Sequence, residues 1–237
     1  MEEGSRTFPA LTDRPRRRVN LLCLIFTAVL VLGQFLVPRR VGFAVLLIAV
    51  CHLPNLQAIS LGGAGFTAVR LVILAGLMRA GAEGFLAWSS RNSLDVLMGL
   101  WSAVALLSTL GHHPRYTNPL SERLALIYDL MGTYLFARAY LRTPGDFLRF
   151  TRVFSWVLIS MAIPLLAQKL MRLNLYAGLG DVQALVREGT VRASGAFGHP
   201  ILAGTAGGVA LPLMVALHTW NRRLGMAGIM ACAAIVV

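Results

Sequence analysis

The stretch from Val186 to Gly208, VREGTVRASGAFGHPILAGTAGG, places charged side chains, glycines and a histidine directly before a long apolar run. An arginine can bind a phosphate with two parallel hydrogen bonds, and its weakly hydrated guanidinium suits a partly dry site. Arg192 is therefore the candidate catalytic residue, and Arg187 is a candidate for substrate binding beside it. Anchoring to lipid headgroups is the alternative role for an arginine at such a position.

His199 comes directly before Pro200, at the predicted start of a helix, where proline is favoured in the first turn. A histidine there can carry a proton or donate to a phosphate, or it can simply be a hydrogen-bonded polar residue at an interface. Gly204 and Gly208 form a GxxxG pair, which indicates close helix packing more often than room for a substrate. No second ligand lies at a suitable spacing, so we predict no metal at His199.

Three charged side chains lie inside apolar runs and are further candidates for substrate binding: Arg70, Asp129 and Arg138. A carboxylate within a membrane is costly and is by default a functional or pairing residue. Asp129 and Arg138 point to different sides of one helix, so an Arg70–Asp129 pair between helices is the structural alternative. Arg138 can also extend to the cytoplasmic membrane surface.

The loop HHPRYTNP contributes Arg115 as a last substrate-binding candidate, because it is predicted on the same side as Arg192. Its two adjacent histidines have no cysteine or carboxylate cluster beside them, so they do not predict a metal site. Soluble-enzyme motifs such as phosphate loops are absent from the sequence.

The elements that position these residues are predicted from composition. Hydrophobic residues make up 57% of the chain and charged residues only 14%, against about 25% in a soluble domain. The apolar residues come in blocks separated by short connectors with arginines. This pattern predicts an all-α, polytopic transmembrane helical bundle with seven or eight apolar segments. The net charge of +12 then reflects topology and contact with membrane lipids, because no basic face is interleaved with aromatics as in nucleic-acid binding.

The chain divides into a polar, arginine-rich tail over residues 1–18 and a helical domain over 19–237. The apolar runs cover 19–37, 41–53, 66–78, 94–110, 124–141, 154–167, 201–220 and 224–237. The last run would extend only ~21 Å as a helix, short of the ~30 Å membrane core. We therefore expect the chain to be truncated at its C-terminus, as the N-terminal part of a longer protein.

The uneven distribution of arginines among the connectors predicts on which side of the membrane each connector lies. Arginines in the connectors 142–152 and 221–223 place both on the cytoplasmic side, and the 170–199 connector then faces the opposite side. Within it, Asp181 is predicted to cap a short surface helix, DVQALVRE. The tail is also expected on the cytoplasmic side, which requires the second and third runs to cross only once between them.

Two stretches carry a family resemblance. VREGTVRASGAFGHPILAG resembles the O-antigen ligase and O-antigen polymerase superfamily, most of all its exopolysaccharide-polymerase branch. IYDLMGTYLFARAYLRTPGDFLRFTR resembles a connector that those proteins carry earlier in the chain.

The resemblance implies a multi-pass glycosyltransferase of the bacterial inner membrane that uses no cofactor and no metal. Such enzymes take a glycan from an undecaprenyl-diphosphate carrier on the periplasmic face, and pass it to an acceptor glycan or to lipid A core during lipopolysaccharide or exopolysaccharide biosynthesis. The family's essential arginine in its R-x-x-G segment corresponds to Arg192, which would hold the donor diphosphate as a leaving group. The family's catalytic histidine lies in a later loop, so His199 does not take that role, and residues 1–237 alone are expected to be inactive.

Two other classes stay open. A polytopic transporter or lipid-linked-glycan flippase without transferase activity would use Arg70, Asp129 and Arg138 to line a pathway. A membrane assembly subunit would have no substrate of its own.

Overall fold

The computed structural model describes residues 20–54, 58–61, 64–85, 92–111, 119–179, 185–187 and 190–236. Over these residues the chain is predominantly helical, which agrees with the predicted all-α class. The N-terminal tail 1–18 and Arg115 lie outside the described residues.

The helices are α1 (Leu21–Leu36), α2 (Gly42–His52), α3 (Ala68–Ala82), α4 (Ser93–Leu107), α5 (Pro119–Tyr140), α6 (Pro144–Met171), α7 (Pro200–Trp220) and α8 (Arg222–Val236). Short 3-10 turns occur at Arg39–Val41, Ser108–Gly111 and Ala177–Leu179. The strands are β1 (Ala58–Leu61), β2 (Ala64–Thr67), β3 (Leu185–Arg187) and β4 (Thr190–Arg192). They form two antiparallel hairpins, with Ala58 opposite Thr67 and Leu185 opposite Arg192.

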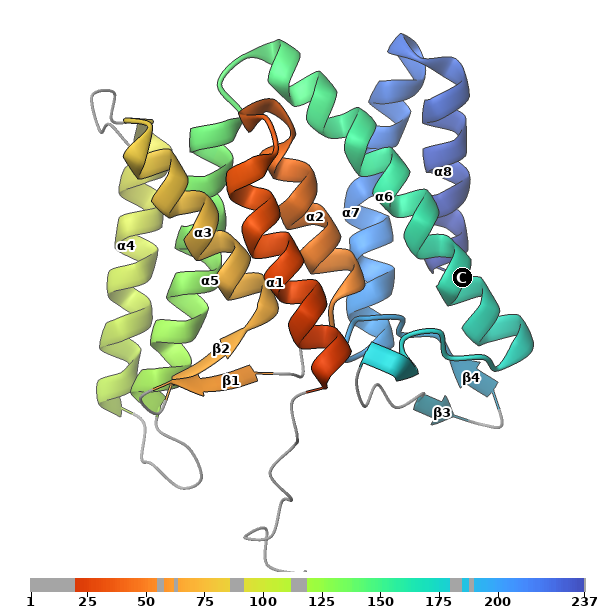
Figure 1. Ribbon diagram of the computed structural model, residues 1–237, viewed down its shortest axis with the longest axis horizontal. Helices are drawn as coiled ribbons and strands as arrows, with labels where there is room; N and C mark the ends of the chain where they lie inside the picture. Colours follow the sequence, from red (N-terminus) through yellow and green to blue (C-terminus); the bar gives the residue numbers. More distant parts are fainter. Residues whose placement is uncertain are drawn as a thin grey trace, which may run out of the picture.

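Successive helices run up and down the bundle, and both hairpins lie at one end of it (Figure 1). The start of α1 lies at this same end, because the Asn20 side-chain amide donates to the carbonyl of Gly178 at 3.0 Å. The ends of α1 and α3 meet at the other end, where an Arg79 guanidinium nitrogen donates to the carbonyl of Val37 at 2.7 Å.

The second and third apolar runs, now α2 and α3, therefore each traverse the bundle, which differs from the single crossing expected for the two together. The hairpin β1–β2 turns the chain between them, and the Thr67 side chain accepts from the backbone N–H of Arg70 to begin α3. The start of α1 thus lies at the end of the bundle that carries the 170–199 connector, and the predicted side of the N-terminal tail stays a prediction, because the tail lies outside the described residues.

Two apolar clusters hold the helices together, and α2 contributes to both. One cluster includes Leu47 and Cys51 of α2 with buried residues of α6, α7 and α8. The other includes Val45 and Ala49 of α2 with buried residues of α1, α3 and α5. The central position of α2 explains why this short helix is among the most buried in the bundle.

By length and apolarity, two of the described helices, α6 and α7, could cross a membrane; α1 and α4 are apolar but shorter. Seven or eight membrane-spanning segments were predicted, but only two of the described helices are long and apolar enough to span a membrane. Proline and polar turns limit several apolar runs to 16 residues or fewer, such as α1, which extends about 24 Å. The 22-residue α5 is long enough, but it carries Glu122, Asp129 and Arg138 along its length.

Large apolar side chains nevertheless cover outward faces of several helices. On α1 and α4 the exposed ones include Leu21, Ile25, Val29, Leu32, Leu36, Leu97, Leu100, Val104 and Leu107. A water-soluble monomer rarely exposes contiguous apolar surface on this scale.

Candidate functional site

Arg192 ends strand β4 and its side chain is exposed at the surface of the bundle end that carries both hairpins. Arg187 lies on the neighbouring strand β3, with Thr190 opposite it in the ladder. The structure thus places the two predicted arginines on one small hairpin.

This hairpin corrects the predicted surface helix, because Leu185–Arg187 is a strand. Val186 and Val191 form a cross-strand pair, and a β-branched side chain favours a strand over a helix. A helix as short as DVQALVRE is also marginal on its own. Asp181, its predicted cap, lies outside the described residues.

Hydrogen bonds to the side chain of Gln168 on α6 fix the backbone of the turn after Arg192. The Gln168 side-chain oxygen accepts from the backbone N–H of Ser194 at 3.1 Å and from that of Gly195 at 3.0 Å. Both Gln168 and Ser194 are buried. The backbone three residues after Arg192 is therefore fixed to α6, whereas Arg192 itself faces outward.

The backbone conformation and close packing of Gly195 explain why glycine stands at the last position of the R-x-x-G segment. Its φ is 58°, in the left-handed region that glycine adopts without strain. A Cβ at this position would also lie 3.1 Å from the Cδ2 atom of Leu165. The spacing from Arg192 to Gly195 thus combines a surface cation with a tight, buried turn.

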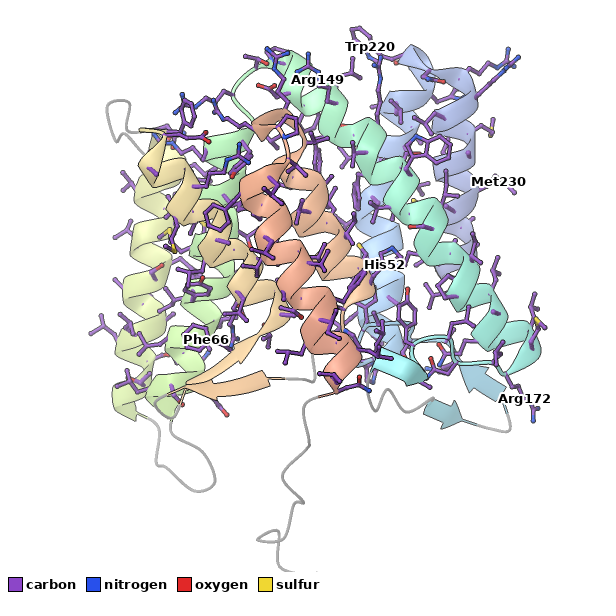
Figure 2. All side chains as sticks on the ribbon, in the orientation of Figure 1. His52, Phe66, Arg149, Arg172, Trp220 and Met230 are labelled. Carbon is purple, nitrogen blue, oxygen red and sulfur yellow. The ribbon has the colours of Figure 1, made fainter. Side chains whose placement is uncertain are left out.

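A hydrogen bond between side chains also joins the connector to α2. The Tyr176 hydroxyl lies 2.9 Å from Nδ1 of His52, and Nε2 of His52 lies 3.0 Å from Oγ of Ser160 on α6. Figure 2 shows His52 between the helices near the connector end. Burial raises the pKa of the Tyr176 phenol above its ordinary value. We call Gln168, Ser194, Gly195, Tyr176 and His52 the connector anchor.

His199 begins α7 and is exposed. Its Nδ1 accepts from the backbone N–H of Ile201 at 3.2 Å, which satisfies one free donor of the helix start. In the neutral ring the proton is then on Nε2, which can donate to an anion. The start of a helix also favours negative charge through its dipole.

The candidates Arg70 and Asp129, which were predicted from their positions inside apolar runs, pair with each other between α3 and α5. Arg70 Nε donates to Asp129 Oδ1 at 2.7 Å, and Nη2 donates to Oδ2 at 2.6 Å. Arg138 pairs with Asp95 of α4, which also accepts from the Tyr134 hydroxyl at 2.6 Å. These pairs lie on the α3–α4–α5 side of the bundle, apart from the β3–β4 hairpin (Figure 1).

Of the connector anchor, Gly195 alone was identified from the sequence. Asp95, the partner of Arg138, was not identified from it either. Gln168 carried a usable signal, since it is an uncharged polar residue at the end of an apolar run. Ser194 and Tyr176 carried none, because their importance comes from contacts between segments distant in sequence.

Across the described part of the chain, no group of three or more histidine, cysteine or acidic side chains could hold a metal ion. No family model, curated protein or solved structure matches the chain. Any functional proposal therefore depends on the geometry of the site and on the resemblance of its motif.

Proposed function

We propose that the protein is a membrane glycosyltransferase of the O-antigen ligase and polymerase type, in which Arg192 binds the diphosphate of a lipid-linked glycan donor. The observation that carries the proposal is the fixed R-x-x-G turn. Gln168 and Gly195 hold the backbone, and Arg192 is presented at the surface beside a membrane-length helix.

Placement in a membrane is supported by the apolar outer faces of α1 and α4 and by the length of α7. The link after α5, which contains Arg142, and the first turn of α8, which contains Arg222 and Arg223, lie at the end opposite the β3–β4 hairpin (Figure 1). Because arginine-rich links favour the cytoplasmic side, the hairpin with Arg192 is proposed to face the periplasm.

The chemistry proposed for this site is substitution at the anomeric carbon of the donor sugar. An acceptor hydroxyl oxygen forms a bond to that carbon, and the bond from the carbon to the diphosphate oxygen breaks. The hydroxyl proton is released to water, and undecaprenyl diphosphate leaves with the electron pair. Arg192 stabilises the added negative charge on the leaving diphosphate, which lowers the barrier. His199 Nε2–H is proposed to donate to the same diphosphate.

The test compares Arg192→Ala, Arg192→Lys and Arg172→Ala in the full gene product. Arg172 lies in the same connector and is exposed, so it is a matched control for loss of one surface cation. We expect Arg192→Ala to lose glycan transfer by at least about 100-fold while the protein stays in the membrane fraction. Lysine should restore only part of the activity, because it cannot bind a phosphate bidentately. Normal transfer by Arg192→Ala would refute the assignment.

A further inference from the structure

A groove of about 410 Å³ opens between the first turns of α6 and the last turns of α7. This volume lies within the range of roughly 300–1,000 Å³ that is typical of ligand sites. Arg149 and Trp220 mark this end of the bundle in Figure 2, and Arg172 of the 170–199 connector lies at the other end. The groove is therefore distinct from the Arg192 site.

The side chains that line the groove are mostly apolar. Its lining includes Phe147, Leu148, Leu213 and Leu217, and the side chain of Leu217 is almost completely buried. Thr151 also lines it, but its hydroxyl donates to the Phe147 carbonyl at 2.9 Å within α6. A polar ligand would lose its hydration here without gaining partners, so the portion of a ligand inside the groove must be apolar.

An exposed tryptophan lines the groove, and exposed arginines lie close to the lining residues in the sequence. Trp220 lines the groove and is 74% exposed, and tryptophan is enriched where a membrane meets water. Arg222 and Arg223 follow it in the chain and are exposed, as is Arg149 on α6. The nearby acidic group is Asp146, which lies 3.6 Å from Arg149 and is outnumbered by these arginines. A negatively charged headgroup therefore complements this end of the groove.

We infer that the α6–α7 groove binds an acyl chain of an anionic phospholipid, with the lipid phosphate held by Arg222 and Arg223. The inference rests on the membrane placement proposed above. It does not depend on glycan transfer, because Arg192 lies at the opposite end. The main competing occupant is a second copy of the chain, which would cover the same apolar surface.

The test follows the fluorescence of Trp220. Replacing Trp88, Trp101 and Trp156 by phenylalanine leaves Trp220 as the one tryptophan of the chain. In phosphatidylcholine vesicles, brominated phosphatidylglycerol should quench Trp220 more strongly than brominated phosphatidylcholine at equal mole fraction. Arg222→Gln with Arg223→Gln should weaken the apparent affinity for phosphatidylglycerol by about fivefold per arginine. Arg172→Gln, at the other end of the bundle, should leave it unchanged.

A second pair of variants tests the groove itself. Ala216 lines the groove, whereas the neighbouring Val215 is exposed but does not line it. Ala216→Phe should abolish the preference for the anionic lipid, and Val215→Phe should preserve it, with circular dichroism confirming equal helicity. Equal quenching by both lipids, or a preference unchanged in Arg222→Gln with Arg223→Gln, would overturn the inference.

Two outcomes separate this inference from the other proposals. Absence of quenching by either lipid, together with a dimeric mass of the chain, would assign the groove to a second copy and also overturn the inference. Normal glycan transfer by Arg192→Ala would refute the enzyme proposal alone and would leave the lipid measurement valid.

Discussion

Gly195 lies so close to Leu165 that a Cβ atom would be 3.1 Å from Cδ2 and 3.3 Å from Cγ of the leucine. The same glycine has a φ of 58°, where an L side chain is strained. The turn that follows Arg192 therefore needs glycine for two independent reasons, backbone conformation and space.

We expect Gly195→Ala to lower the free energy of unfolding by about 2–4 kcal/mol, the combined cost of a left-handed alanine and an overpacked contact. Gly178→Ala is the matched control in the same connector, because nothing lies within 4 Å of its Cβ position. Thermal unfolding of the two variants in detergent checks the difference. Equal stability of the two would show that the turn adapts freely.

Gln168 and Ser194 should differ in how much stability is lost when their polar groups are removed. Gln168→Leu removes the acceptor of two buried N–H groups, at a cost of about 1–3 kcal/mol for each. Ser194→Ala should be nearly neutral, because the serine hydroxyl is buried and makes no hydrogen bond among the described residues.

Hydrogen exchange over residues 193–197 measures this contrast directly. The segment should lose protection in Gln168→Leu and keep it in Ser194→Ala. The reverse order would mean that the serine hydroxyl, and not the glutamine, fixes the turn.

Tyr176 should make stability depend on alkaline pH. Burial raises the pKa of its phenol, so the folded chain keeps this proton at a pH where the unfolded chain has lost it. The folded state then binds more protons, and its stability falls as the pH rises above about 10, the ordinary pKa of tyrosine. Tyr176→Phe should show a shallower loss than the parent chain. The difference between two pH series of thermal unfolding isolates this residue from the other tyrosines.

Much of the helical content was predictable because apolar runs mark helices directly. The run 201–220 corresponds to α7, Pro200–Trp220, and the run 19–37 to α1, Leu21–Leu36. The run 154–167 marks only the later part of α6, which begins at Pro144. Its polar first turns are set by the capping box of Thr143 and Asp146, a local signal that hydrophobicity does not register.

The site was predictable only in part. The arginine and glycine of the R-x-x-G segment stand out in the sequence, but the contact of Gln168 with Ser194 joins residues 26 positions apart and has no sequence signature. Likewise, Arg138 is a predicted substrate-binding residue that could alternatively extend to the membrane surface, and the structure pairs it with Asp95, a residue 43 positions earlier. Such pairings depend on how the helices pack, which periodicity alone does not determine.

The ion pair of Arg70 and Asp129 offers a test between a structural role and a role in substrate binding. Removing one partner leaves a charge without its counterpart, whereas removing both leaves none. Arg70→Met with Asp129→Leu should therefore cost less stability than the sum of the two single variants, with a coupling of about 0.5–3 kcal/mol. Glycan transfer should persist in the double variant. Loss of transfer despite normal folding would instead assign the pair a role in binding the substrate.

The helix-capping role of His199 and its proposed contact with the donor diphosphate can be separated by different substitutions. Its Nδ1 caps α7, and a small polar side chain such as asparagine can replace that acceptor. His199→Asn should keep stability within about 0.5 kcal/mol, and His199→Ala should lose about 1 kcal/mol with the cap. If Nε2–H also contacts the donor diphosphate, both variants should raise the KM for the lipid-linked donor. Steady-state kinetics together with thermal unfolding distinguish the roles, and an unchanged KM in His199→Asn would restrict His199 to capping the helix.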